Sequence, residues 1–277
     1  MRSLEKTVED IKRVKVQGAK EIAIYALKFL KNFCRKNGFK LKFEVAARVL
    51  EEARPTAVVL HNCLEILKKR RRLRTIDQLI KKLESSTKKI AKVGSKVIKD
   101  NSKIMTYCHS SEALAVIAKA KRMNKKFSVI ACVTEPLEQG VKTAKELTSL
   151  KIPVTLITDN AIGFFIKEVD CVIVGCDAIR KEGIINKIGT YLLAISAKEN
   201  KKPFYVVGST MKFDRRKKLI IEERPPEEVE RKIIQRINRK KIKIRNVAFD
   251  LTPWKYVTRV ITEKGILKPR EVLRLLK

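Results

Sequence analysis

Hydrophobic positions in the first hundred residues recur three or four apart, which is the spacing of an α-helix. They predict helices at 19–38, 42–53, 57–72 and 75–100. The first of these closes on Asn37-Gly38, a typical helix end, and the second stops before Arg54-Pro55 because proline cannot continue a helix. The N-terminal part of the chain is therefore predicted to be helical throughout.

The pattern changes after Asn101, where short runs rich in β-branched residues alternate with helical patterns. The predicted strands are 103–108, 127–133, 153–158, 171–175 and 203–208, and 245–253 adds one more. The predicted helices between them are 111–123, 138–150, 160–168 and 186–200. Nearly continuous apolar strands with intervening helices are typical of a parallel sheet that is covered on both faces. The sequence thus predicts an α/β protein with an N-terminal helical domain (1–100) and a doubly wound parallel-sheet domain (101–277).

Charge is the unusual feature of the composition. The chain has 64 Lys and Arg against 30 Asp and Glu, a formal net charge of +34, which attracts anions of any kind. The basic residues are spread along the chain and are densest at 68–74, whereas aromatic residues make up only 6%. Dedicated nucleic-acid sites usually add aromatic residues or a recognisable module. We therefore expect nucleic acid to bind only non-specifically, with a steep dependence on salt.

Cysteine usage indicates a reducing compartment. The chain has six cysteines, namely Cys34, Cys63, Cys108, Cys132, Cys171 and Cys176. They form no CxxC pair and no cluster at zinc-ligand spacing, so neither a disulfide framework nor a metal site is expected. The sequence also has no apolar run of membrane-spanning length and no secretory pattern at residues 1–15. These features predict a soluble, cytoplasmic protein without membrane contact.

Candidate chemistry is sought at the carboxyl ends of the predicted strands, because open parallel sheets bind their ligands there. The residues at those ends are Cys108, Thr134 with Glu135, Asp159, Asp177 and the segment 208–213. Cys108 precedes a helix that Ser110 or Ser111 can cap, so the positive end of the helix is expected to lower the pKa of its thiol.

Asp177 follows a buried strand, so burial is expected to raise the pKa of its carboxyl and make it a general acid. Asn186 is expected to cap a helix that begins at Lys187 or Ile188 and offers its free amides to an anion. Lys187, Lys212 and Arg54 would add positive charge. Neither GxGxxG nor GxxxxGK[ST] occurs, so the common nucleotide-binding loops are not expected.

A thiol, a carboxylic acid and several cations at one sheet edge fit the aldose–ketose isomerisation of a phosphorylated sugar, because a proton can pass between the thiolate and the acid. This chemistry requires neither a metal nor a redox cofactor.

Five stretches of the chain carry a resemblance to known proteins, namely "YCHSSEALAV", "VIVGCDAI", "INKIGTYLLAISAKEN", "PFYVVGSTMKFD" and "IRNVAFDLTPWKYVTRVITEKGI". Together they resemble a superfamily with three groups: archaeal ribose-1,5-bisphosphate isomerase, methylthioribose-1-phosphate isomerase, and the regulatory (alpha, beta, delta) subunits of the translation initiation factor 2B complex. The resemblance covers nearly the whole chain, and "RPTAV" at 54–58 is similar to the ribose-bisphosphate isomerases in particular. It implies a helical N-terminal domain, a Rossmann-like C-terminal domain, and assembly into homodimers or larger rings.

The resemblance also implies roles for single residues. Cys108 would accept the proton from C2 of the sugar, and Asp177 would donate a proton during ring opening and transfer. The contacts to phosphate and sugar would come from Gly18, Ala19, Arg54, Ser110, Ser111, Asn186, Lys187 and Lys212.

Two departures from the isomerase pattern concern arginines. The isomerases have Arg-Gly-Ala where this chain has Gln17 before Gly18, and Lys20 is a candidate to supply the missing charge. They also have Glu-Thr-Arg-Pro after the second α/β strand, where this chain has the shorter "TEPLEQG" around Pro136.

The leading hypothesis is nevertheless a ribose 1,5-bisphosphate isomerase, since the regulatory subunits generally lack the Cys–Asp pair. Two alternatives stay open. One is a non-catalytic regulatory protein that binds a nucleotide or sugar phosphate and engages initiation factor 2 subunits. The other is a methylthioribose-1-phosphate isomerase, whose substrate carries only one phosphate.

Overall fold

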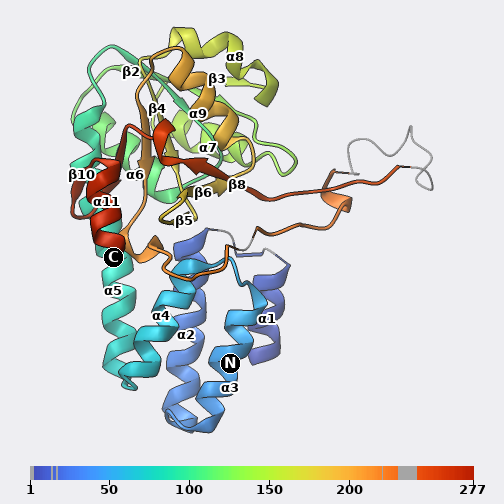
Figure 1. Cartoon of the computed structure of the whole chain (residues 1–277). Helices are drawn as coiled ribbons and strands as arrows, with labels where there is room; N and C mark the ends of the chain where they lie inside the picture. The colour runs from blue at the N-terminus through green and yellow to red at the C-terminus, as the bar shows by residue number, and fades with distance from the viewer. Residues whose placement is uncertain (1–2, 14, 17, 220, 230–241) are drawn as a thin grey trace.

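The computed structural model describes residues 3–13, 15–16, 18–219, 221–229 and 242–277. Figure 1 shows a helical part, drawn in blue, beneath a part built around a β-sheet. Each of the four helices predicted before residue 101 is present, which confirms the helical character of this part. Its helices are α1 (Leu4–Lys12), α2 (Ala19–Asn37), α3 (Leu41–Ala53), α4 (Val58–Lys69) and α5 (Leu73–Gly94).

The ends of these helices follow local chemistry. Gly38 caps α2 with a φ of 66°, a conformation that glycine adopts at little cost. Helix α3 ends at Ala53, ahead of Pro55. Helix α1 was not predicted; it begins where the Ser3 side chain accepts a hydrogen bond from the Lys6 amide.

The main sheet has seven strands in the order β10-β9-β7-β4-β1-β2-β3. All neighbouring pairs are parallel except β9 with β10, so the predicted doubly wound α/β fold is confirmed. The strands are β1 (Ser102–Thr106), β2 (Phe127–Cys132), β3 (Val154–Ile157), β4 (Cys171–Gly175), β7 (Phe204–Val207), β9 (Arg259–Thr262) and β10 (Gly265–Leu267). The last two were not predicted.

Helices cover both faces of this sheet. Helices α6 (Ser111–Arg122) and α7 (Gln139–Ser149) pack on one face, together with the end of α5. Helices α8 (Ile162–Phe165), α9 (Thr190–Glu199) and α11 (Pro269–Leu276) pack on the other. Adjacent residues of β1 therefore join different cores, Ile104 one and Met105 the other. The predicted helix 160–168 is only a short α-helix between two 3₁₀ turns.

A second, antiparallel sheet corrects two predictions. It consists of β5 (Ala178–Ile179), β6 (Gly183–Lys187) and β8 (Phe249–Pro253). The strand predicted at 245–253 exists as β8 but belongs to this sheet. The prediction that Asn186 caps a helix beginning at Lys187 or Ile188 was wrong, because Asn186 and Lys187 end a strand.

Helix α9 begins only at Thr190, behind Gly189 at a φ of 98°. The amides of Gly189 and Tyr191 donate to Asp250, so they are not available as the predicted anion site.

Helix α5 joins the two parts of the molecule. Its residues Ile76 and Leu83 belong to the helical core, whereas Ile90 belongs to a core of the sheet. The division of the chain at residue 100 therefore stays a prediction. Within the described ranges, no helix combines the length and apolarity that a membrane span requires.

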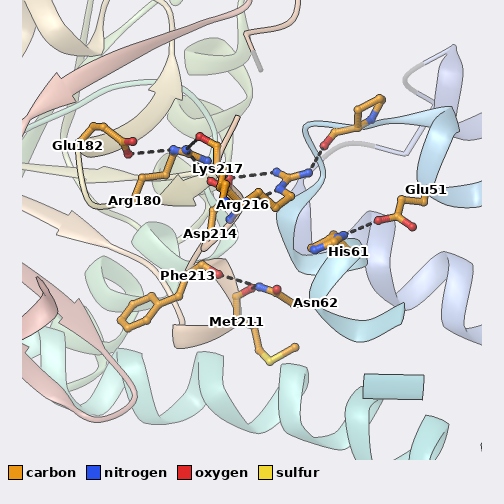
Figure 2. A network of polar contacts seen from close by, with 11 residues as sticks. Glu51, His61, Asn62, Arg180, Glu182, Met211, Phe213, Asp214, Arg216 and Lys217 are labelled. Atoms are coloured by element: carbon orange, nitrogen blue, oxygen red, sulfur yellow. Dashed lines mark hydrogen bonds and ion pairs between the residues drawn. The ribbon is translucent and has the colours of Figure 1, made fainter. Parts of the chain in front are cut away.

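A polar network also links the helical part to the segment after β7 (Figure 2). Asn62 of α4 donates to the carbonyls of Met211 at 2.9 Å and Phe213 at 3.0 Å. Arg216 donates to Asp214 and to the carbonyl of Pro55 at 2.7 Å. This network fixes the backbone on both sides of Lys212 against the helices.

Candidate active site

Cys108 and Asp177 lie just beyond the carboxyl ends of neighbouring strands. Strands β1 and β4 are paired in parallel, with Ile104 opposite Cys171. From β1 the chain proceeds to β2 on one side of the sheet, and β4 lies on the other side, so the strand order reverses between them. Ligands of doubly wound folds bind in the crevice at such a reversal.

A cavity of about 260 Å³ lies at this point. It is lined from both parts of the molecule, by the start of α2 and by the loops after the strands. The eleven residues that were expected to be catalytic or to contact the substrate all line it; these are Gly18, Ala19, Lys20, Arg54, Cys108, Ser110, Ser111, Asp177, Asn186, Lys187 and Lys212.

The backbone of Cys108 is held in a rare conformation. Its φ is 65°, in the left-handed region that non-glycine residues seldom adopt. Its N–H donates to Thr134 Oγ1 at 2.9 Å, and its carbonyl accepts from Thr143 Oγ1 at 2.8 Å. Cys108 is also partly buried, whereas the other five cysteines are buried. Strain of this kind, kept in place by neighbouring groups, is frequent at functional sites.

Residues after the next two strands, β2 and β3, hold the backbone of Cys108 through hydrogen bonds. Thr134, after β2, has a φ of 66°, and its N–H donates to Asp159 Oδ1 at 2.8 Å. The N–H of Glu135 donates to the other oxygen of Asp159 at 2.7 Å. Thr134 and Asp159 do not line the cavity. Thr134 accepts the hydrogen bond of the Cys108 N–H, and Asp159 in turn accepts one from the Thr134 N–H.

Burial decides the protonation of both central groups. It raises the pKa of the Cys108 thiol to about 12, although the His109 N–H and the charge of Lys187 act to lower it. The expected lowering by the helix start was wrong in direction, because the loss of solvation outweighs it. Burial likewise raises the pKa of Asp177, in the predicted direction, against the charges of Lys212 and Arg54.

The start of α2 is suited to hold an anion. Gly18 precedes it at a φ of 90°, no side-chain hydrogen bond caps the helix, and Gly18 and Ala19 line the cavity. Arg54 lies at the same end of the cavity, and its Nε is 3.5 Å from Glu222 Oε2. Its Nη1 is buried and has no hydrogen-bond partner among the described residues. A buried donor without a partner is costly, and a bound phosphate would supply the acceptor.

The other cations of the cavity differ in their contacts. Lys212 is buried, and its Nζ lies 2.6 Å from Glu112 Oε2. Lys20 contacts Thr87 at 3.2 Å and Glu21 at 3.3 Å.

The two residues at the end of β6 are buried as well. Burial lowers the pKa of Lys187, which the charge of Cys108 partly opposes. Asn186 donates to Thr190 Oγ1 at 2.9 Å.

The two serines have separate contacts. Ser110 caps α6 by accepting a hydrogen bond from the Ala113 N–H, as one of the two predicted alternatives had it. Ser111 instead donates to Glu21 of α2 at 2.9 Å, which ties the loop after β1 to the helical part.

Sequence reasoning missed several residues of the cavity wall. Gln139, the first residue of α7, has a buried Oε1 without a described hydrogen-bond partner, so it can accept a hydrogen bond from a ligand. Its position after β2, at the same sheet edge, was the signal available. Arg224 and Lys142 add positive charge to the wall, and Arg224 is paired with Glu228. No local pattern distinguished these two from the many other basic residues.

The structure describes only one of the two positions at which the chain departs from the isomerase pattern. Gln17 lies outside the described residues. At the turn around Pro136, Leu137 lines the cavity where the isomerases have their Glu-Thr-Arg-Pro segment. Within the described part of the chain, no group of three or more His, Cys, Asp or Glu side chains is arranged to hold a metal ion.

Comparison with known proteins places the chain in one family. The family model described as "Initiation factor 2 subunit family" matches residues 15–269. A ribose 1,5-bisphosphate isomerase from Archaeoglobus fulgidus is 39% identical over 97% of this chain and 91% of its own length. A methylthioribose-1-phosphate isomerase from Acetivibrio thermocellus is 38% identical over 94% and 86%. A solved structure of the translation initiation factor eIF-2B from Pyrococcus horikoshii superposes with a TM-score of 0.87 at 30% identity, covering 98% of both chains. The chain therefore belongs to the initiation factor 2 subunit family.

Proposed function

We propose that the protein is an aldose–ketose isomerase that converts ribose 1,5-bisphosphate to ribulose 1,5-bisphosphate. The observation that carries the proposal is the meeting of Cys108 and Asp177 on one cavity, beside Arg54, whose buried Nη1 has no hydrogen-bond partner among the described residues. The name of the Archaeoglobus relative supports the choice of substrate.

The two residues divide the proton transfers between them. Protonated Asp177 donates to the ring oxygen as the bond between C1 and that oxygen breaks. The Cys108 thiolate removes the proton from C2, which gives an enol across C1 and C2. Cys108 then returns a proton to C1, while the hydroxyl on C2 loses its proton to Asp177 and becomes the ketone. Both residues end in their starting state, so the cycle balances without a cofactor.

The electrostatics of the cavity bear on both roles. Burial raises the pKa of Asp177, which favours the protonated form that a general acid requires. Cys108 must lose its proton to act; burial opposes this loss, and the charge of Lys187 favours the thiolate. A phosphate held by Arg54 and the start of α2 would place the sugar between the thiol and the carboxyl.

The proposal is tested by incubating the purified protein with ribose 1,5-bisphosphate and following ketose formation by NMR. Methylthioribose 1-phosphate in a parallel reaction separates the two isomerase hypotheses. Turnover of methylthioribose 1-phosphate alone would show that the monophosphate is the substrate, whereas the proposed proton transfers by Cys108 and Asp177 would still apply.

The alternative is a non-catalytic regulatory protein, which the similarity to the Pyrococcus horikoshii structure favours. It predicts no turnover of either sugar, together with capture of initiation factor 2 subunits in a pull-down. In either case we expect a homodimer or larger homo-oligomer, which light scattering of the purified protein can measure.

A further inference from the structure

A second hollow lies at the opposite edge of the main sheet from the cavity of Cys108. It has a volume of about 580 Å³. It lies at the amino ends of the parallel strands β7 and β9, where Lys202 precedes β7 and Arg259 begins β9. Its lining includes six basic residues, namely Lys198, Lys202, Lys255, Arg259, Lys268 and Arg270. At the average composition of 64 Lys and Arg in 277 residues, its ten lining residues would include about two.

No acidic side chain in the described part of the chain neutralises these cations through an ion pair. The lining contains no acidic residue, and none of the six forms an ion pair with any residue that the structure describes. Lys198 Nζ donates to the carbonyl of Lys255 at 3.4 Å, and Lys202 Nζ to that of Lys167 at 3.0 Å. Carbonyl groups hold the two amines in place but leave their charge uncompensated, so the hollow concentrates positive potential.

The basic cluster at 68–74, the densest in the sequence, provides the contrast. There Lys68 pairs with Glu51 at 3.3 Å and Glu65 at 2.8 Å, and Arg71 pairs with Glu44. Carboxylates of α3 and α4 thus pair with two of the six cations of that cluster. The six cations of the hollow come together from α9, β9, α11 and the adjoining loops, and none of them pairs with a carboxylate of the described residues.

We propose that this hollow binds a chain of phosphates, such as the backbone of single-stranded RNA or inorganic polyphosphate, without sequence preference. Lysines bind phosphates as point charges, and the hollow is large enough for more than one phosphate group. Tyr256 also lines it, with Lys255 Nζ 5.1 Å from the ring centroid and the Tyr191 ring in an edge contact at 5.4 Å between centroids. This site is separate from the proposed isomerase chemistry.

The test compares two triple charge reversals with the same change in net charge. One is K198E/K255E/K268E, at exposed positions of the hollow, and the control is K81E/K88E/K92E, at exposed positions of α5. Binding of labelled oligo(U) RNA, about twenty nucleotides long, and of labelled polyphosphate is measured by fluorescence anisotropy over a range of NaCl concentrations.

The hollow variant is expected to bind both ligands about tenfold or more weakly than wild type, with the slope of log K against log [salt] reduced by about 2. The control variant is expected to change the affinity less than about threefold. Equal losses in the two variants would overturn the proposal, because net charge alone would then explain binding. Polyglutamate that displaces RNA as well as polyphosphate does would also overturn it, since the hollow would not select phosphates. Thermal melts and isomerase turnover of both variants are expected to match wild type.

Discussion

Lys212 and Glu112, one hundred positions apart, form a buried ion pair with 2.6 Å between Nζ and Oε2. Burial alone would lower the pKa of Lys212, but the charge and hydrogen bond of Glu112 outweigh it and the pKa is raised. Lys212 therefore stays charged in the cavity wall, where Asn62 and the network of Figure 2 fix its backbone.

This pair predicts a strongly non-additive effect on stability. Glu112→Gln leaves a buried ammonium without its partner and is expected to lower the free energy of unfolding by about 3–5 kcal/mol. The double variant E112Q/K212M removes both charges and is expected to cost distinctly less. Urea denaturation of E112Q, K212M and E112Q/K212M measures the loss in the free energy of unfolding for each variant. Additive costs would show that the two residues do not depend on each other.

The hydrogen bond from Cys108 to Thr134 predicts a positioning role for the threonine. Thr134→Val keeps the shape but leaves the Cys108 N–H without its acceptor, which is expected to cost about 1–3 kcal/mol of stability. If the strained backbone at Cys108 aims the thiol, kcat falls about tenfold or more while KM is retained. Thr134→Ser should restore both values. Thr148→Val, on the exposed part of α7, is the matched control. A loss of stability with unchanged kcat would confine Thr134 to a structural role.

Arg54 is expected to bind phosphate through its planar guanidinium. Arg54→Lys keeps the charge but cannot form two parallel hydrogen bonds, so KM for the bisphosphate is expected to rise about tenfold or more. Arg48→Lys, on the exposed face of α3, is expected to leave KM unchanged. Steady-state kinetics of the two variants make the comparison, and equal KM values would remove Arg54 from the binding site.

Asp250 predicts a dependence of stability on pH. Burial raises the pKa of its carboxyl to about 6, although the amides of Tyr191 and Gly189 oppose the shift. The folded state therefore holds this proton more tightly than the unfolded chain. The resulting stabilisation is complete below about pH 4 and is lost as the pH rises through about 6. The loss should amount to about 2 kcal/mol relative to Asp250→Asn, measured by urea denaturation between pH 4 and pH 7. Parallel curves for the two proteins would contradict the assignment.

Five of the seven strands of the main sheet, and the edge of the sheet at which the cavity lies, could be predicted from the sequence because both depend on local patterns. Strands such as Cys171–Gly175 are apolar throughout, and parallel strands place their carboxyl ends at one edge. Cys108 and Asp177 could therefore be paired before the structure was known.

The features that sequence reasoning missed depend on distant contacts. Strand β6 pairs with β8, some sixty residues later, so the "GIINK" segment gave no local sign of its antiparallel partner. The pKa of Cys108 is governed by burial within the whole fold, whereas the helix start behind it is the only part a local pattern shows. Charge density along the chain likewise pointed to 68–74, because the carboxylates that pair with Lys68 and Arg71 come from elsewhere in the sequence, on α3 and α4.

Turnover of ribose 1,5-bisphosphate by wild type and by Cys108→Ser, followed by NMR, tests the central claim most directly. A serine hydroxyl is far less acidic than a thiol, so the substitution removes the proposed base while keeping the shape of the residue. Wild type is expected to form the ketose, and Cys108→Ser to be slower by about a hundredfold or more. Absence of ketose with wild type, or equal rates for the two proteins, would contradict an isomerase that works through Cys108.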